Sequence, residues 1–156
     1  MEEQQIKQSV KNRYGKIAIT DQTGGCCAPT SNNCGCSEES VGYSKQELNT
    51  IPEKSILGVG CGAPVNFANI KEGEIVVDLG SGAGIDVFLC ANKVKDSGIV
   101  IGIDMTDEML QRSRNNANQG GYSNVEFRKG DIKRRIRVED NSVDLVIFPQ
   151  DFKELR

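Results

Sequence analysis

The 156-residue sequence contains no histidine, so it lacks the usual general base near neutral pH and the commonest metal ligand. This absence excludes Ser-His-Asp and Cys-His catalysis and any metal site built on histidine. The sequence also lacks the run of about 18 apolar residues that a membrane-spanning helix needs. Its first residues, MEEQQIKQ, lack the apolar core of a secretion signal. We therefore expect no membrane partner and a cytoplasmic location.

An excess of positive charge is also missing, because 19 basic residues face 22 acidic ones. Such a chain has no strong field to attract a phosphate backbone, and we expect no nucleic-acid partner. The short basic run KRRIR at 133–137 is more typical of a solvated loop than of an RNA contact.

Cysteine, in contrast, is well represented, and five of the six cysteines lie between residues 26 and 61. In a reducing compartment they are thiols or ligands rather than a disulfide framework. Cys26-Cys27 and Cys34-x-Cys36 lack the paired C-x-x-C spacing of zinc ribbons, whereas Cys61 lies among glycines in a turn that could expose its thiolate. Thiolates select soft metals and metalloids. Cys90 lies in an apolar helical stretch and is expected to pack in the core.

The apolar pattern predicts an α/β fold, a Rossmann-like parallel sheet preceded by a Cys-rich helix and loop region. We expect the division at residues 1–72 and 73–156. The second part alternates strands and helices, with right-handed crossovers and the strand order 3-2-1-4. The ranges expected are a helix over 1–18, a loop over 19–43, a capped helix over 44–49, strands over 75–79, 99–103, 125–128 and 143–148, and helices over 85–94 and 106–119.

A glycine-rich loop, Gly80-Ser81-Gly82-Ala83-Gly84, links the strand over 75–79 to the next helix. Its G-x-G-x-G spacing differs from the G-x-G-x-x-G of dinucleotide sites. Asp78, just before the loop, would repel a phosphate but could orient the loop or accept a hydrogen bond from a ligand ammonium. Asp104 and Asp131 follow the next two strands, and an acid in the place of Asp104 can accept hydrogen bonds from both ribose hydroxyls. Together these positions predict an adenosine site without phosphates.

On these motifs the sequence resembles the class I S-adenosylmethionine-dependent methyltransferases. The resemblance implies that S-adenosylmethionine is the cofactor and that the chain holds the first half of their fold. The residues implied to bind it are Asp78, Gly80, Ser81 and Gly82 around the methionine part, Asp104 at the ribose, and Met105, Asp131 and Ile132 around adenine.

The order of the N-terminal features resembles the arsenite methyltransferases more narrowly. Tyr14-Gly15-Lys16, the Cys26-Cys27 pair, Gly42-Tyr43-Ser44 and the Cys61 turn precede the Asp78 loop. The resemblance implies a small-molecule substrate, trivalent arsenic held by the thiolates of Cys61 and of Cys26 or Cys27, which attacks the sulfonium methyl group.

The sequence departs from that family in two places. Gln150 stands where the family has a further cysteine ligand, and a carboxamide cannot replace a thiolate. The family's later strands have no counterpart before Arg156, which would leave the fourth strand as an open edge. We expect either a truncated or diverged gene product, whose turnover is open, or a half-domain that forms a homodimer through this edge. Two other functions remain open: a thiol module that binds arsenite or a soft metal beside a residual cofactor site, and an ordinary small-molecule methyltransferase.

Overall fold

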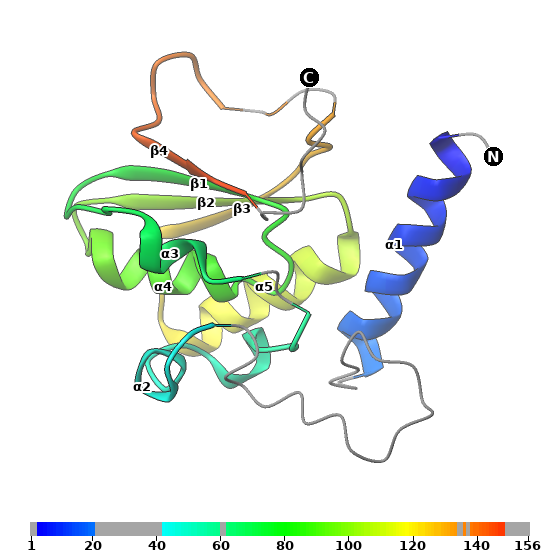
Figure 1. Cartoon of the computed structure of the whole chain (residues 1–156), viewed down its shortest axis with the longest axis horizontal. Helices are drawn as coiled ribbons and strands as arrows, with labels where there is room; N and C mark the ends of the chain where they lie inside the picture. The colour runs from blue at the N-terminus through cyan, green and yellow to red at the C-terminus, as the bar shows by residue number, and fades with distance from the viewer. Residues whose placement is uncertain (1–2, 21–41, 60–61, 134–135, 137, 149–156) are drawn as a thin grey trace.

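The computed structural model describes residues 3–20, 42–59, 62–133, 136 and 138–148 (Figure 1). Its centre is a parallel sheet in the order β3-β2-β1-β4, as the sequence predicts. The strands are β1 (Ile75–Leu79), β2 (Ile99–Asp104), β3 (Val125–Lys129) and β4 (Leu145–Ile147).

Both faces of the sheet are covered, which explains why β1 and β2 are nearly continuous apolar runs. Helices α4 (Ile85–Val94) and α5 (Asp107–Gly120) lie on one side, and the chain between β3 and β4 lies on the other (Figure 1). The first face buries Val76 and Val100 against α4. The second face packs Ile101 and Ile103 against apolar side chains of the chain that follows β3.

The chain before β1 adds one long helix and three short elements to this core. They are α1 (Glu3–Thr20), α2 (Lys45–Leu48), a 3₁₀ helix (Glu53–Ser55) and α3 (Pro64–Phe67). Helix α1 lies against α5, where Arg112 donates hydrogen bonds to the backbone carbonyls of Ala18 (2.9 Å) and Lys54 (2.8 Å). The predicted capping box at Ser44 and Glu47 is confirmed, since each side chain accepts from the other residue's backbone N–H. No helix of these described segments is long and apolar enough to cross a membrane.

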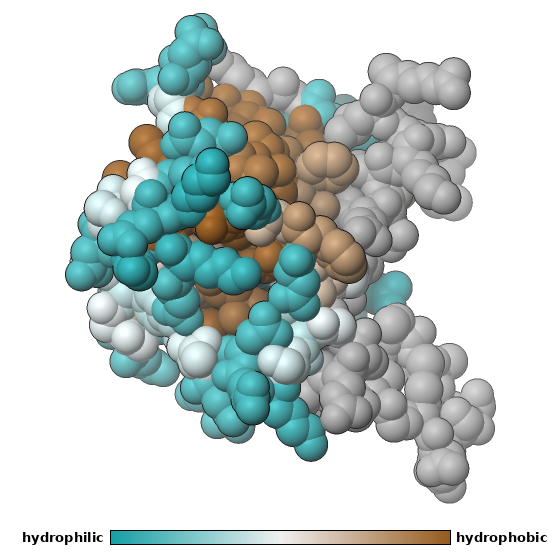
Figure 2. Space-filling view, turned by 60° about the vertical axis from the view of Figure 1, so that its left-hand side comes forward, coloured by the Kyte–Doolittle hydropathy of each residue, from teal (hydrophilic) through white to brown (hydrophobic). Residues whose placement is uncertain are grey.

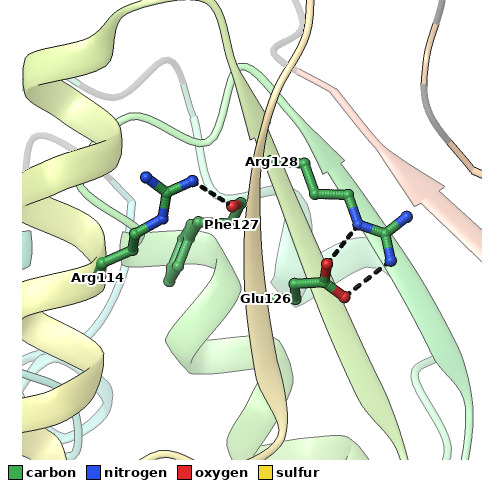
Figure 3. Close-up of polar contacts among 4 residues, drawn as sticks. All are labelled: Arg114, Glu126, Phe127 and Arg128. Carbon is green, nitrogen blue, oxygen red and sulfur yellow. Dashed lines mark hydrogen bonds and ion pairs between the residues drawn. The ribbon is translucent and has the colours of Figure 1, made fainter.

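The edge strand β3 contacts an arginine of α5 and carries an ion pair on its own surface (Figure 3). Arg114 donates to the backbone carbonyl of Phe127 at 2.7 Å, and Arg128 forms two 2.7 Å contacts with the carboxylate of Glu126. Charged side chains of this kind protect a sheet edge from pairing with another chain. At the other described edge, Val146 of β4 is 46% exposed.

Several elements differ from the sequence prediction. The first helix continues to residue 20 instead of ending at 18, and neither the 3₁₀ helix nor α3 was predicted. The other helices and strands differ from the predicted ranges by one residue at one or both ends, apart from β1 and α4, which match, and β4. The fourth strand is shorter than the predicted 143–148, because the Asp144 carboxylate accepts the Ile75 N–H (2.8 Å) in place of a strand carbonyl. Because the Asp144 side chain takes this hydrogen bond, β4 begins at Leu145.

Candidate functional site

The glycine loop turns the chain from β1 into α4 at the carboxyl edge of the sheet. Gly80, Gly82 and Gly84 have φ angles of 80°, 52° and 99°, a region that side chains rarely adopt. A Cβ on Gly84 would lie 2.8 Å from the Phe88 ring, so a larger residue there would also collide with the core. The N–H groups of Gly80 (2.7 Å) and Ser81 (3.1 Å) both donate to the Ile103 carbonyl, which brings the loop across the end of β2.

Asp104, the last residue of β2, is bonded to this loop. One of its carboxylate oxygens accepts the Gly82 N–H (3.0 Å) and the other accepts the Thr106 N–H (2.8 Å). A carboxylate oxygen can accept two hydrogen bonds, so each retains one acceptor position. Since the side chain is partly exposed, these positions fit the two hydroxyls of a ribose. Met105, the next residue, is half-buried.

Asp131 lies just beyond β3, where the Gly130 N–H donates to the backbone carbonyl of Asp104 (3.0 Å). Its carboxylate accepts from the ammonium of Lys7 on α1 (2.8 Å) and from the Lys133 N–H (3.0 Å). The structure therefore brings Asp104 and Asp131 to neighbouring strand ends. Ile132 packs partly against the second face of the sheet, so its position beside adenine stays a prediction.

Asp78 has a different environment from the other two acids. Its side chain is buried, and its Oδ2 has no hydrogen-bond partner among the described residues. Burial raises the pKa of Asp78, and the nearby carboxylates of Asp86 and Asp104 raise it further. Ser81 Oγ is also buried and has no hydrogen-bond partner among the described residues. It lies beside Gly102, where an added Cβ would come within 2.8 Å of it. A ligand carrying positive charge and a hydrogen-bond donor would satisfy this end of the site.

Two residues that were not among the predicted site residues, Tyr43 and Asp86, lie near Asp78. The Tyr43 hydroxyl donates to Asp86 Oδ1 at 2.5 Å and accepts the Val65 N–H at 3.3 Å. Burial raises the pKa of both Tyr43 and Asp86, although the hydrogen bond from Tyr43 partly lowers that of Asp86. An acid in the first turn of a helix is too common to predict such a contact, and Tyr43 is distant from Asp86 in the sequence.

The predicted thiol ligands Cys26, Cys27 and Cys61 lie outside the described residues, as does Gln150. The two sides of the Cys61 turn are nevertheless placed. Val59 packs with the cluster that includes Ala83 of the glycine loop, and Val65 is bonded to Tyr43. Cys90 is completely buried, as expected for a core residue, and burial raises the pKa of its thiol.

Comparisons with known proteins agree with this geometry. A model of the methyltransferase-domain family matches residues 70–154. An arsenite methyltransferase of Halobacterium salinarum is 39% identical over 92% of this chain, and one of Aquipseudomonas alcaligenes is 34% identical over 91%. A 23S rRNA uracil methyltransferase of Acinetobacter baylyi is 32% identical over 56% of this chain. The chain spans only 39% and 41% of the two arsenite methyltransferases.

A solved structure is similar as well. The arsenic(III) S-adenosylmethionine methyltransferase of Chlamydomonas reinhardtii superimposes with a TM-score of 0.52 and 29% identity, covering 72% of this chain and 38% of that one. The residues present fit such a cofactor, because the buried Oδ2 of Asp78 has no hydrogen-bond partner among the described residues and Asp104 retains two acceptor positions. The chain therefore belongs to the family of S-adenosylmethionine-dependent methyltransferases.

Proposed function

We propose that this chain carries the cofactor-binding part of an arsenite methyltransferase, with thiol-bound trivalent arsenic as the methyl acceptor. One observation carries the choice of substrate. The family model begins at residue 70, whereas the similarity to arsenite methyltransferases covers 91–92% of the chain and so includes much of the cysteine-rich part before residue 70. The similarity to the rRNA enzyme covers only 56%.

The proposed cofactor site has an acidic end and a ribose end. S-adenosylmethionine, when bound, supplies an electrophilic methyl group on a positively charged sulfur. Asp78 would hold negative charge near that part of the ligand, with Gly80, Ser81 and Gly82 allowing a close backbone approach. Asp104 would accept the ribose hydroxyls, and Met105, Asp131 and Ile132 would lie around adenine.

The proposed arsenic ligands are the thiolates of Cys61 and of Cys26 or Cys27. Thiolates leave the lone pair of trivalent arsenic free to act as the nucleophile, so the reaction needs little acid-base chemistry, in agreement with a chain that has no histidine. The contribution of the protein would be alignment of the arsenic with the methyl group.

A second candidate is a thiol module that binds arsenite beside a residual cofactor site. Gln150, which occupies the position of a family cysteine, favours this alternative because an amide does not coordinate arsenic as a thiolate does.

Calorimetric titration of the wild type and of Cys61→Ser with S-adenosylmethionine and with arsenite tests both proposals. We expect the wild type to bind both ligands, and Cys61→Ser to lose arsenite but keep the cofactor. Methylated arsenic in the product mixture would establish the enzyme. Arsenite binding without cofactor binding would support the thiol module, and cofactor binding without arsenite binding would identify a methyltransferase for another small molecule.

Three further predictions remain: the division at residue 72, a cytoplasmic location and a homodimer.

Exposed apolar side chains support the proposal of a homodimer. They include Phe67, Val146 and Phe148, and Figure 2 shows apolar groups at the surface of one face. Size-exclusion chromatography with light scattering would test the dimer, and a stable monomer would contradict pairing through β4.

A further inference from the structure

Asp86 is a half-buried acid in the first turn of α4, two residues after the last glycine of the loop. Its Oδ1 accepts a 2.5 Å hydrogen bond from the hydroxyl of Tyr43, a side chain that is only 2% exposed. That hydroxyl is held in turn by the Val65 N–H, which donates to it at 3.3 Å. The orientation of the Asp86 carboxylate is therefore fixed by contacts with segments that are distant in the sequence.

A second acid, Asp78, lies at the other end of the glycine loop. Asp86 is close enough to raise the pKa of Asp78, whose buried Oδ2 has no hydrogen-bond partner in the described part of the chain. Within the same segments neither carboxylate forms an ion pair with a basic side chain, and the Lys93 ammonium contacts the Val65 carbonyl at 3.4 Å instead. Buried charges are normally paired, so these two acids leave a place for a cation.

We propose that Asp86, together with Asp78, binds the α-ammonium of the methionine part of S-adenosylmethionine, and that Tyr43 is the positioning residue that orients Asp86. This inference rests on the proposed function, because it assigns a further residue to the same cofactor site. A primary ammonium has one positive charge and three N–H donors, so two carboxylates can share it. The sulfonium centre has the charge but no N–H, and it cannot donate to the unpaired oxygen of Asp78.

The chain offers a matched control for the loss of this carboxylate. An acid in the first turn of a helix also interacts favourably with the positive end of the helix dipole, whatever else it contacts. Asp107 lies in the first turn of α5, which follows β2 as α4 follows β1. Its carboxylate accepts from the Lys129 ammonium at 2.6 Å, and its side chain is 70% exposed. Asp86→Asn and Asp107→Asn thus remove the same charge from the same place on two helices, but Asp107 already has a cation.

The first measurement needs no turnover and compares two ligands by calorimetry. S-adenosylhomocysteine carries the α-ammonium but no sulfonium, and 5′-methylthioadenosine has the same adenosine without the amino-acid part. We expect Asp86→Asn to weaken S-adenosylhomocysteine about tenfold, because a hydrogen bond to a charged group is lost. Its affinity for 5′-methylthioadenosine should be unchanged, and Asp107→Asn should alter neither affinity. A merely structural role of Asp86 would weaken both ligands together.

The second measurement tests whether Tyr43 acts through Asp86. Tyr43→Phe keeps the ring and releases the carboxylate, so it should weaken S-adenosylhomocysteine about threefold and leave 5′-methylthioadenosine unchanged. In the Asp86→Asn background it should cause no further loss, and additive losses would contradict the link. Tyr122→Phe is the control, because its hydroxyl donates to the Thr50 carbonyl and to Asn92 Oδ1, both at 3.2 Å, and should change neither affinity.

Equal losses for the two ligands in Asp86→Asn, or no loss for either, would overturn the inference. A loss seen with S-adenosylmethionine but not with S-adenosylhomocysteine would place Asp86 at the sulfonium and would overturn it as well. Failure of the proposed function has a different signature, namely a wild type that binds neither cofactor-like ligand. Thermal denaturation checks that each variant is folded, and if Asp86→Asn is not, the same comparison of ligands in Tyr43→Phe decides.

Discussion

Two acids, Asp78 and Asp104, lie near the carboxyl ends of the neighbouring strands β1 and β2, and their environments differ. Asp104 is partly exposed, and both of its oxygens accept backbone N–H groups. Asp78 is buried, and its Oδ2 has no partner among the described residues. The same residue type, at the ends of adjacent strands, therefore has opposite surroundings.

The difference indicates that Asp104 supports the structure of the loop, whereas Asp78 is better suited to bind a ligand. The Gly82 and Thr106 N–H groups donate to the carboxylate of Asp104, and the first of these hydrogen bonds fixes the loop at Gly82. Burial and two neighbouring carboxylates make ionisation of Asp78 unfavourable in the free protein, which raises its pKa. A positively charged ligand would remove that penalty, so the β1 end is adapted to binding rather than to stability.

The largest effect is expected from Asp104→Asn. The amide has one acceptor oxygen and one donor NH₂, so either the Gly82 or the Thr106 N–H would face a donor. Stability should fall by about 1–3 kcal/mol, and affinity for S-adenosylmethionine should fall about 10- to 100-fold. Chemical denaturation and calorimetry measure the two effects, and unchanged stability would contradict the assigned hydrogen bonds.

Asp78→Asn should have the opposite effect on stability. Asparagine keeps the size of the side chain and removes the charge that burial disfavours. The melting temperature of the free protein should rise by about 2–4 °C for each kcal/mol gained, while affinity for S-adenosylmethionine should fall roughly tenfold, about 1.4 kcal/mol. A lower melting temperature would indicate that Asp78 is paired in solution.

The same contrast predicts a pH dependence. Because the pKa of Asp78 is raised on folding, its contribution to stability is present at low pH and is lost as the pH rises through the folded pKa. The ionised form binds a cation, so affinity for S-adenosylmethionine should rise as the pH rises toward the raised pKa of Asp78, and binding below that pKa should release a proton. Calorimetry in buffers of different ionisation enthalpy measures that proton, and Asp78→Asn should release none from this site.

The smallest effect is expected at the β3 end from Lys7→Ala. The ion pair between Lys7 and Asp131 is partly exposed, with side-chain exposures of 25% and 28%. Such pairs contribute roughly 0.2–1 kcal/mol and weaken with salt. The melting temperature should fall slightly at low salt and hardly at all at about 1 M salt. A large loss that persists in high salt would show that Lys7 supports α1 by packing instead.

Much of the fold could be predicted from local patterns. The apolar runs of β1 and β2, the glycines between β1 and α4, and the capping box at Ser44 are all properties of short segments. The start of β4 could not be predicted, since it depends on a hydrogen bond between Asp144 and Ile75, 69 residues apart. The contact between Tyr43 and Asp86 was missed for the same reason, because neither residue belongs to a motif that implies the other.

By itself the sequence determined the parallel α/β order and the acids at the strand ends, because apolar periodicity and glycine spacing act over a few residues. Only the tertiary structure decided which acid is satisfied and which is not. Asp104 meets the N–H groups of Gly82 and Thr106 once β2 lies beside the loop, whereas Asp78 is enclosed by the packing around it. The free energy of an ionisable group is set by its neighbours in space, and those neighbours come from distant parts of the chain.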